Sequence, residues 1–182
     1  MIFTQTRELE RVRAITSVVA ASLLIALGAQ VRIPLPFSPV PVTLQTFAVL
    51  LVGAQLGSRR GALAVLAYLA QGLVGLPVFA GWSGGVAHLL GPTGGYLLGF
   101  VAAAYLTGFL FERGWGARLL TAGAALLAGN VAIYALGLPW LALYVGAGRA
   151  LALGLAPFIV GDVAKVVGAT VLLHTAHAKF TA

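Results

Sequence analysis

The chain contains no cysteine and is poor in charge, since only 8% of its 182 residues are Asp, Glu, Lys or Arg. The absence of cysteine excludes disulfides, thiol catalysis and thiolate metal sites. Soluble proteins average about 25% charged residues, whereas 60% of this chain is hydrophobic and its mean hydropathy is +1.03. The composition therefore predicts an all-α integral membrane protein that acts within or beside the bilayer.

Two further absences bear on catalysis and on metals. No Gly-x-x-x-x-Gly-Lys phosphate loop and no nucleophile with an adjacent base is present, so we do not expect an enzyme, and ATP hydrolysis by this chain is unsupported. His88 stands apart from His174 and His177, which are three residues apart near one end of the chain and lack a third ligand. We expect no metal and no cofactor.

The net charge of +7 comes from basic residues scattered at the ends of apolar segments. Nucleic-acid-binding proteins gather such residues into a patch with interleaved aromatics, so membrane topology explains the charge better. Arginines before a first apolar run also occur in signal peptides. Because no cleavage site followed by a hydrophilic domain is present, we expect a retained first helix.

Alternating apolar segments and connections predict a compact bundle of six transmembrane helices in a single domain, residues 1–182. A helical span needs about 20 mostly apolar residues, so the chain leaves no room for a soluble catalytic domain. The expected helices lie near 14–29, 43–57, 62–75, 94–112, 117–136 and 150–175, with outer connections near 30–42, 76–93 and 137–149.

Lysine and arginine are concentrated on one side of these expected helices. Cytoplasmic loops carry the excess of positive charge, so cytoplasmic N- and C-termini place eight basic residues inside and two, Arg32 and Arg149, outside. Seven of the eight prolines then lie in the outer connections. Elaborate loops on one face of a scaffold often carry binding sites, and we expect the site to open outward. The eight inner residues are Arg7, Arg11, Arg13, Arg59, Arg60, Arg113, Arg118 and Lys179.

The first outer connection, 30–42, holds Pro34, Pro36, Pro39 and Pro41. Each proline removes a backbone donor and biases the preceding residue towards an extended conformation. The segment is therefore expected to be stiff, extended and apolar. It is either a lid that lies against the bundle or a simple connector.

Asp162 and Lys165 are the acid and the base that cannot be placed in a water-facing loop. Charges at membrane depth are costly and usually face the bundle interior, which makes them functional candidates. Residues three apart share one face of a helix, so the two can form either a ligand-recognition pair or a structural ion pair. A carboxylate only accepts hydrogen bonds and an ammonium only donates them. As a recognition pair they suit a cyclic urea or an amide.

The segment Gly91-Pro92-Thr93-Gly94-Gly95-Tyr96 opens the expected helix 94–112. Thr93 is a candidate N-cap, and Gly94 and Gly95 permit close backbone approach. A helix N-terminus can hold a carboxylate, but the glycines can equally serve helix packing. Tyr96 either covers an apolar ring in a pocket or anchors the helix at the interface. As ligand contacts, Gly94 and Gly95 should not tolerate a bulky residue, which would block binding without unfolding the protein.

Four other residues complete the candidate binding set. Asn130 is an amide at membrane depth that needs a partner, either another helix or a ligand. Gln45 lies where the proline-rich segment enters the second expected helix, as a ligand contact or a helix cap. Phe79 and Trp82 lie in the outer connection 76–93. A small, partly apolar acid with a urea-like or amide-like head would satisfy Asp162, Lys165 and the start of the helix 94–112 together.

Three motifs in this order resemble the BioY family, the biotin-specific substrate-binding (S) components of energy-coupling factor (ECF) vitamin transporters. The resemblance runs from Gln30 to Lys165. The motifs are Ile33-Pro34-Leu35-Pro36 through Pro41-Val42-Thr43-Leu44-Gln45-Thr46, then Gly91-Pro92-Thr93-Gly94-Gly95-Tyr96, and Gly161-Asp162-x-x-Lys165.

The resemblance implies a six-helix S-component fold in a prokaryotic cell membrane and high-affinity biotin binding from the outside. It further implies Asp162 on the ureido N–H groups and Lys165 on the ureido oxygen. The reverse arrangement, with Lys165 on the valerate carboxylate, is also open. Two other functions remain: a stand-alone secondary carrier with Asp162 and Lys165 as a proton relay, and an intramembrane enzyme acting on lipid, which lacks a catalytic set.

The resemblance also implies partners, namely a transmembrane coupling protein and two cytoplasmic ATPases, contacted through the first three helices. The family carries a pair of alanines four residues apart in its first helix. Here the small pairs at this spacing are Ser17 with Ala21 and Ser22 with Ala26.

Overall fold

The computed structural model describes the backbone of residues 2–180 and the side chains of 8–175. The expectations for the side chains of Arg7, His177 and Lys179 lie outside the described residues. The described chain is almost entirely helical, as its composition predicts. Its elements are α1 (Ile2–Gln30), β1 (Arg32–Ile33), β2 (Val42–Thr43), α2 (Gln45–Leu73), α3 (Val86–Leu89), α4 (Gly94–Glu112), the 3-10 helix η1 (Trp115–Ala117), α5 (Leu119–Val145), α6 (Ala147–Gly154) and α7 (Ile159–Phe180).

The helices are suited to a membrane. Within the described residues, α1, α2, α4 and α5 are long and apolar enough to cross one, and α6 and α7, bent by 48°, together could form a fifth span. The described part thus contains seven α-helices rather than the six that the sequence predicts. The difference arises in α2, at the connection 76–93 and around α6.

Helix α2 contains a sharp corner. Gly57 has φ 79° and ψ 177°, a backbone conformation that glycine adopts without steric cost. The two segments on either side fold back on each other, so that Gln45 Nε2 donates to the hydroxyl of Tyr68 at 2.6 Å. At 1.5 Å per residue the segments are about 18 Å and 24 Å long. The predicted break at 58–61 is therefore one residue late, because these residues begin the second helical segment.

The structure agrees with the predicted bounds of α4 and differs from those of the last two predicted helices. Helix α4 spans the predicted residues 94–112. The predicted end at 136 and the outer connection 137–149 are wrong, since α5 continues through Pro139 to Val145. Transmembrane helices tolerate an internal proline when their surroundings satisfy the freed backbone groups. The single helix 150–175 is also wrong. The chain breaks at 155–158, where Pro157 disfavours the helical conformation of the residue before it.

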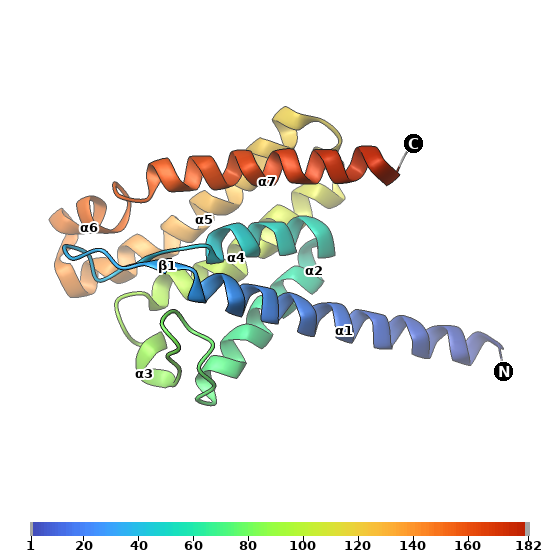
Figure 1. Cartoon of the computed structure of the whole chain (residues 1–182), viewed down its shortest axis with the longest axis horizontal. Helices are drawn as coiled ribbons and strands as arrows, with labels where there is room; N and C mark the ends of the chain where they lie inside the picture. The colour runs from blue at the N-terminus through green and yellow to red at the C-terminus, as the bar shows by residue number, and fades with distance from the viewer. Residues whose placement is uncertain (1, 181–182) are drawn as a thin grey trace.

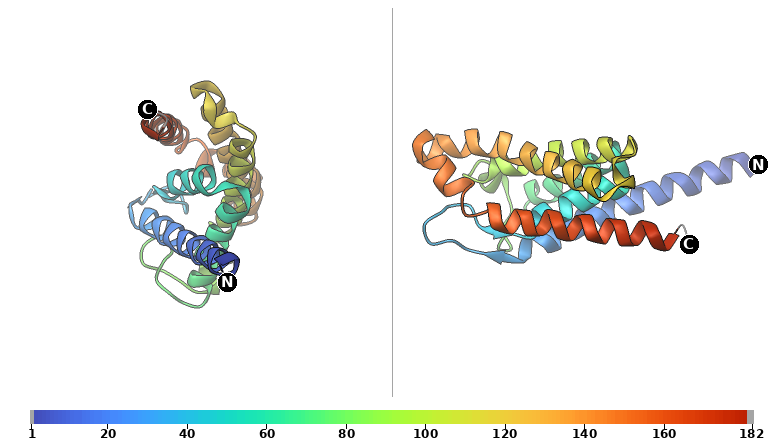
Figure 2. Two further views of the ribbon diagram at one scale, coloured as in Figure 1. Left: turned by 90° about the vertical axis from the view of Figure 1, so that its right-hand side faces the viewer. Right: turned by 90° about the horizontal axis from the view of Figure 1, so that it is seen from above.

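The helices form one bundle with two different ends. Helices α4 and α5 pack together, α2 packs on α4, and α1 packs on α2. Helix α7 contacts both α5 and α2 and completes the bundle (Figures 1 and 2). Both termini and the corner of α2 lie at one end, whereas the β1–β2 hairpin, α3 and α6 lie at the other (Figure 1). The predicted extended segment 30–42 is this hairpin, in which Arg32 pairs with Thr43.

Glycines allow α2 and α4 to approach closely. A Cβ on Gly53 would stand 2.5 Å from the carbonyl oxygen of Ala104, and one on Gly108 would stand 2.4 Å from the backbone nitrogen of Ser58. Such close contacts are how small residues pack transmembrane helices. At the same place the backbone N–H of Ser58 donates to Glu112 Oε1 at 2.8 Å. Glu112 thus satisfies an orphan donor at the start of the second segment of α2.

Replacing Gly108 with alanine should destabilise the bundle, because the new methyl group meets backbone atoms that cannot move aside. We expect a loss of about 2 kcal/mol or more, measured by thermal unfolding of the purified protein in detergent. The matched control is Gly148→Ala in α6, where no atom outside the adjoining backbone lies within 4 Å of the added methyl group. That variant should be unchanged or slightly more stable. Equal unfolding temperatures for the two variants would contradict this packing.

Candidate functional site

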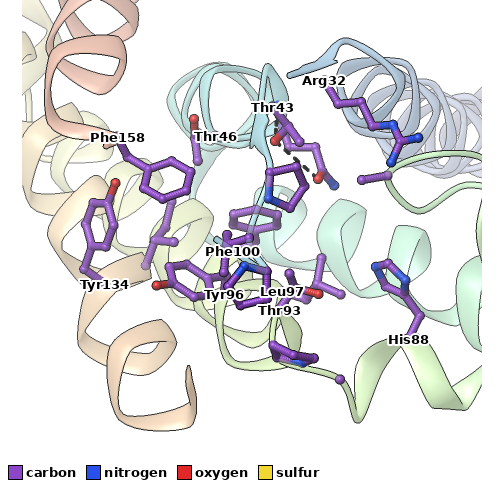
Figure 3. Close-up of a pocket in the computed structure, with 18 of the residues that line it drawn as sticks. Arg32, Thr43, Thr46, His88, Thr93, Tyr96, Leu97, Phe100, Tyr134 and Phe158 are labelled. Carbon is purple, nitrogen blue, oxygen red and sulfur yellow. Dashed lines mark hydrogen bonds between the residues drawn. The ribbon is translucent and has the colours of Figure 1, made fainter. Parts of the chain in front are cut away.

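A cavity of about 360 Å³ lies at the end of the bundle away from the termini. It is enclosed by the start of α2, by α4, α5 and α7, and by the β1–β2 hairpin and the segment 80–93. The volume falls at the small end of the range for ligand sites. Figure 3 shows Tyr134, Phe158 and Thr46 towards one end of the cavity and Arg32 and His88 at the other.

The cavity floor consists of four polar side chains, Thr46, Tyr134, Asp162 and Lys165. The ammonium of Lys165 donates to Asp162 Oδ1 and to Thr46 Oγ1, each at 3.0 Å. The hydroxyl of Tyr134 donates to Asp162 Oδ2. Asp162 is only 4% exposed, and a buried charge is tolerated when it is both paired and hydrogen-bonded. The predicted pair therefore exists, and it faces a cavity.

The floor retains hydrogen-bonding capacity for a ligand. An ammonium carries three donors and a carboxylate about four acceptor sites, and the described part of the chain supplies two partners to each of these groups. The hydroxyl of Thr46 accepts from Lys165 and keeps its own hydrogen. The floor can thus donate to a carbonyl oxygen and accept from N–H groups at the same time.

The walls of the cavity are apolar and buried. Leu97 and Phe100 of α4, Ile133 of α5 and Phe158 line it. Tyr96 adds its ring, which meets the ring of Tyr134 edge to face with centroids 6.1 Å apart. The walls therefore suit an apolar ring system.

The hydroxyl of Tyr96 has a structural role. It donates to the backbone oxygen of Gly154 at 2.9 Å and holds the end of α6 against the bundle. The ring, rather than the hydroxyl, is what Tyr96 offers a ligand.

The cavity mouth is formed by Arg32, Pro39, Ala87 and His88, of which all but His88 are exposed. Arg32 has no ion pair with a carboxylate within the described residues. The ring of His88 stacks on Phe79 with centroids 5.0 Å apart. Burial lowers the pKa of His88 below its ordinary value and so favours the neutral ring. Arg32 therefore carries the positive charge of the mouth.

Four of the predicted binding residues line this cavity, namely Gln45, Tyr96, Asp162 and Lys165. Gly94 and Gly95 do not line it. A Cβ on Gly94 would stand 1.8 Å from the carbonyl oxygen of Leu89, and one on Gly95 would stand 2.2 Å from Cβ of Trp140. A bulky residue at either position would disrupt packing, so the expectation of blocked binding in an otherwise intact protein is not supported by this geometry.

The other three predicted residues also lie outside the cavity lining. Asn130 is buried, and its Oδ1 has no partner among the described residues. Phe79 is 0% exposed and lies behind His88. Trp82 is 70% exposed, and its backbone N–H donates to Gln30.

Sequence reasoning missed several lining residues, above all Tyr134 and Thr46. Tyr134 stands one helical turn after Asn130 on α5, and that spacing was an available signal. Thr46 directly follows Gln45, which lines the same cavity. Other missed lining residues include Arg32, Thr43, His88, Leu97, Phe100, Ile133 and Phe158.

Comparisons with known proteins agree with one another. The sequence model of the BioY family matches residues 4–182. A protein of Pyrococcus horikoshii named probable biotin transporter BioY is 45% identical over 149 residues, covering 82% of this chain and 86% of its own. The biotin transporter BioY of Rhodobacter capsulatus is 45% identical over 159 residues, covering 81% and 83%.

A solved structure is similar over nearly the whole fold. It is the crystal structure of the S-component for biotin from an ECF-type ABC transporter, with a TM-score of 0.84 and 29% sequence identity. The match covers 93% of each chain.

Removing one member of the buried pair should cost stability even without ligand. In Lys165→Met the carboxylate of Asp162 loses its counter-charge, and we expect a loss of about 3 kcal/mol. The double variant Asp162→Asn/Lys165→Met removes both charges and should recover most of that loss. Thermal unfolding of both proteins in the same detergent measures the difference. A single variant as stable as the double variant would show that the pair is not coupled.

Proposed function

The chain belongs to the BioY family, and we propose that it is the biotin-binding S component of an ATP-driven ECF transporter, which takes up biotin from outside the cell. The observation that carries this proposal is the cavity floor, where Asp162 and Lys165 keep unused hydrogen-bonding capacity beneath apolar walls. The named relatives and the biotin S-component structure support the same function.

The chemistry of biotin matches the cavity from floor to mouth. Its ureido group presents two N–H donors and one carbonyl acceptor, its thiophane ring is apolar, and its valerate chain ends in a carboxylate. Asp162 accepts from the ureido N–H groups, and Lys165 donates to the ureido oxygen. Tyr134 holds the carboxylate of Asp162 in place through its hydroxyl. The apolar ring then lies among the aromatic side chains of the walls.

This arrangement is favoured over the reverse one, in which Lys165 binds the valerate carboxylate. The charge of Lys165 is already neutralised by Asp162 at 3.0 Å, so the floor offers no net positive charge to an anion. The mouth offers a positive charge to an anion through Arg32. The valerate carboxylate therefore points to the mouth.

The site opens to the outside in this proposal, with both termini in the cytoplasm. Among the described basic residues, Arg11 and Arg13 of α1, Arg59 beside the corner of α2 and Arg113, which directly follows α4, belong to the end of the bundle away from the cavity. The positive-inside rule assigns that end to the cytoplasm. Each segment of α2 counts as one short membrane crossing. With α1, α4, α5 and α7, the chain then makes six crossings.

Partners supply the ATP hydrolysis, namely a transmembrane coupling protein and two cytoplasmic ATPases. We place the contact surface on α1 and α2. Ser22 and Ala26 of α1 are buried, and Ser22 Oγ accepts from Gln71 of α2 at 2.9 Å, so this pair serves the bundle itself. The exposed face of α1, with Ile15, Val19 and Leu27, is the part left free for the coupling protein.

Biotin affinity should depend on the floor. Asp162→Asn removes charge-assisted hydrogen bonds to the ureido N–H groups and should weaken binding by about 10- to 150-fold. Tyr134→Phe keeps the ring but no longer orients the carboxylate, and we expect a loss of about tenfold. Isothermal titration of biotin into each purified variant measures both effects.

The control is Tyr105→Phe, which makes the same chemical change on the exposed surface of α4, outside the cavity. Its affinity should equal that of the parent. Parental affinity in both floor variants would remove the floor from the biotin site.

Orientation can be tested with single cysteines, because the chain has none of its own. Ala87 lies exposed at the mouth, and Arg59 lies exposed beside the corner of α2. A membrane-impermeant maleimide should label Ala87→Cys in intact cells and Arg59→Cys only after the membrane is opened. The opposite pattern would place the mouth in the cytoplasm and contradict uptake from outside.

A further inference from the structure

The two ends of the cavity differ in how tightly they enclose a ligand. At the floor, Asp162 is buried and the other three polar residues, Thr46, Tyr134 and Lys165, are half-buried. At the mouth, Arg32, Pro39 and Ala87 are exposed to solvent. Figure 3 shows Arg32 and His88 at the opposite end from Tyr134 and Phe158. A ligand whose head occupies the floor and whose tail reaches the mouth therefore presents the end of that tail to water.

The single charge at the mouth gives a free carboxylate only a small advantage. Arg32 is exposed, and its guanidinium lies against the backbone of Gly81. The ring of His88 stacks on Phe79, and its burial lowers the pKa and disfavours a second positive charge at the mouth. Exposed ion pairs are worth little, which corresponds to a change in affinity of about fivefold or less.

We infer that the site recognises the bicyclic head of biotin and accepts ligands in which the valerate carboxyl group is joined to an amine, such as biotinamide and biotinyl-lysine. This inference rests on the proposed function and extends its substrate class from the free vitamin to small biotin amides. The amide group occupies the place of the carboxylate beside Arg32, and the added amine extends through the mouth into solvent.

Isothermal titration of the purified full chain tests this with four ligands: biotin, biotinamide, biotinyl-lysine and a biotin methylated on a ureido nitrogen. Both amides should bind within about tenfold of biotin. The methylated ligand should bind more than about 100-fold more weakly than biotin, because the methyl group replaces an N–H donor and adds bulk at the floor. In Arg32→Ala, biotin should weaken by about fivefold and biotinamide should be unchanged, while Arg32→Lys should restore biotin.

The outcomes separate the two proposals. If biotin binds but both amides bind more than about 100-fold more weakly than biotin, the inference is overturned and the proposed function stands. If biotin itself does not bind the parent protein, both the proposed function and the inference are contradicted. Weakening of biotinamide as large as that of biotin in Arg32→Ala would also overturn the inference, since the neutral amide would then depend on the same charge.

Discussion

Burial of an acid and a base at membrane depth is the constraint on which the rest of this structure depends. Charged side chains there must be paired and hydrogen-bonded. Asp162 and Lys165 do so with each other and with Tyr134 and Thr46. The four residues come from α2, α5 and α7, so the network fastens α7 to the bundle. The same network leaves donors and acceptors facing a cavity, and this links the stability of the fold to ligand recognition.

The close contacts between α2 and α4 lie at the end of the bundle away from the cavity. Gly53 and Gly108 bring α2 and α4 into backbone contact near the corner at Gly57. Towards the opposite end the helices are joined by the hairpin and by the segment 80–93, whose side chains line the cavity. Tyr96 ties α6 to this end through Gly154. Rigid packing thus supports a site whose rim is made of loops.

The energetic cost of intramembrane charge was enough to identify Asp162 and Lys165 from the sequence. The segment 91–96 predicted where α4 begins, although the side chain of Thr93 makes no capping hydrogen bond. Prolines were less informative, because Pro139 lies inside α5 whereas Pro157 separates α6 from α7. Whether a helix survives a proline depends on which neighbours satisfy the freed backbone groups. That is a property of the assembled bundle and has no local signature.

Long-range contacts also decided which candidates belong to the cavity. Gly94 and Gly95 had two readings, and contact with Leu89 and Trp140 makes them packing residues. A tyrosine in an apolar helix is typical of an interfacial anchor. Only the fold shows that the hydroxyl of Tyr134 reaches Asp162. The BioY resemblance supplied the ligand class, while the cavity supplied the physical reason for it.

The most direct test of the central claim is an experimental structure of this chain with biotin bound. The account predicts the ureido group between Asp162 and Lys165, with the valerate chain directed towards Arg32. Biotin bound elsewhere in the bundle, or bound with its carboxylate on Lys165, would contradict the account.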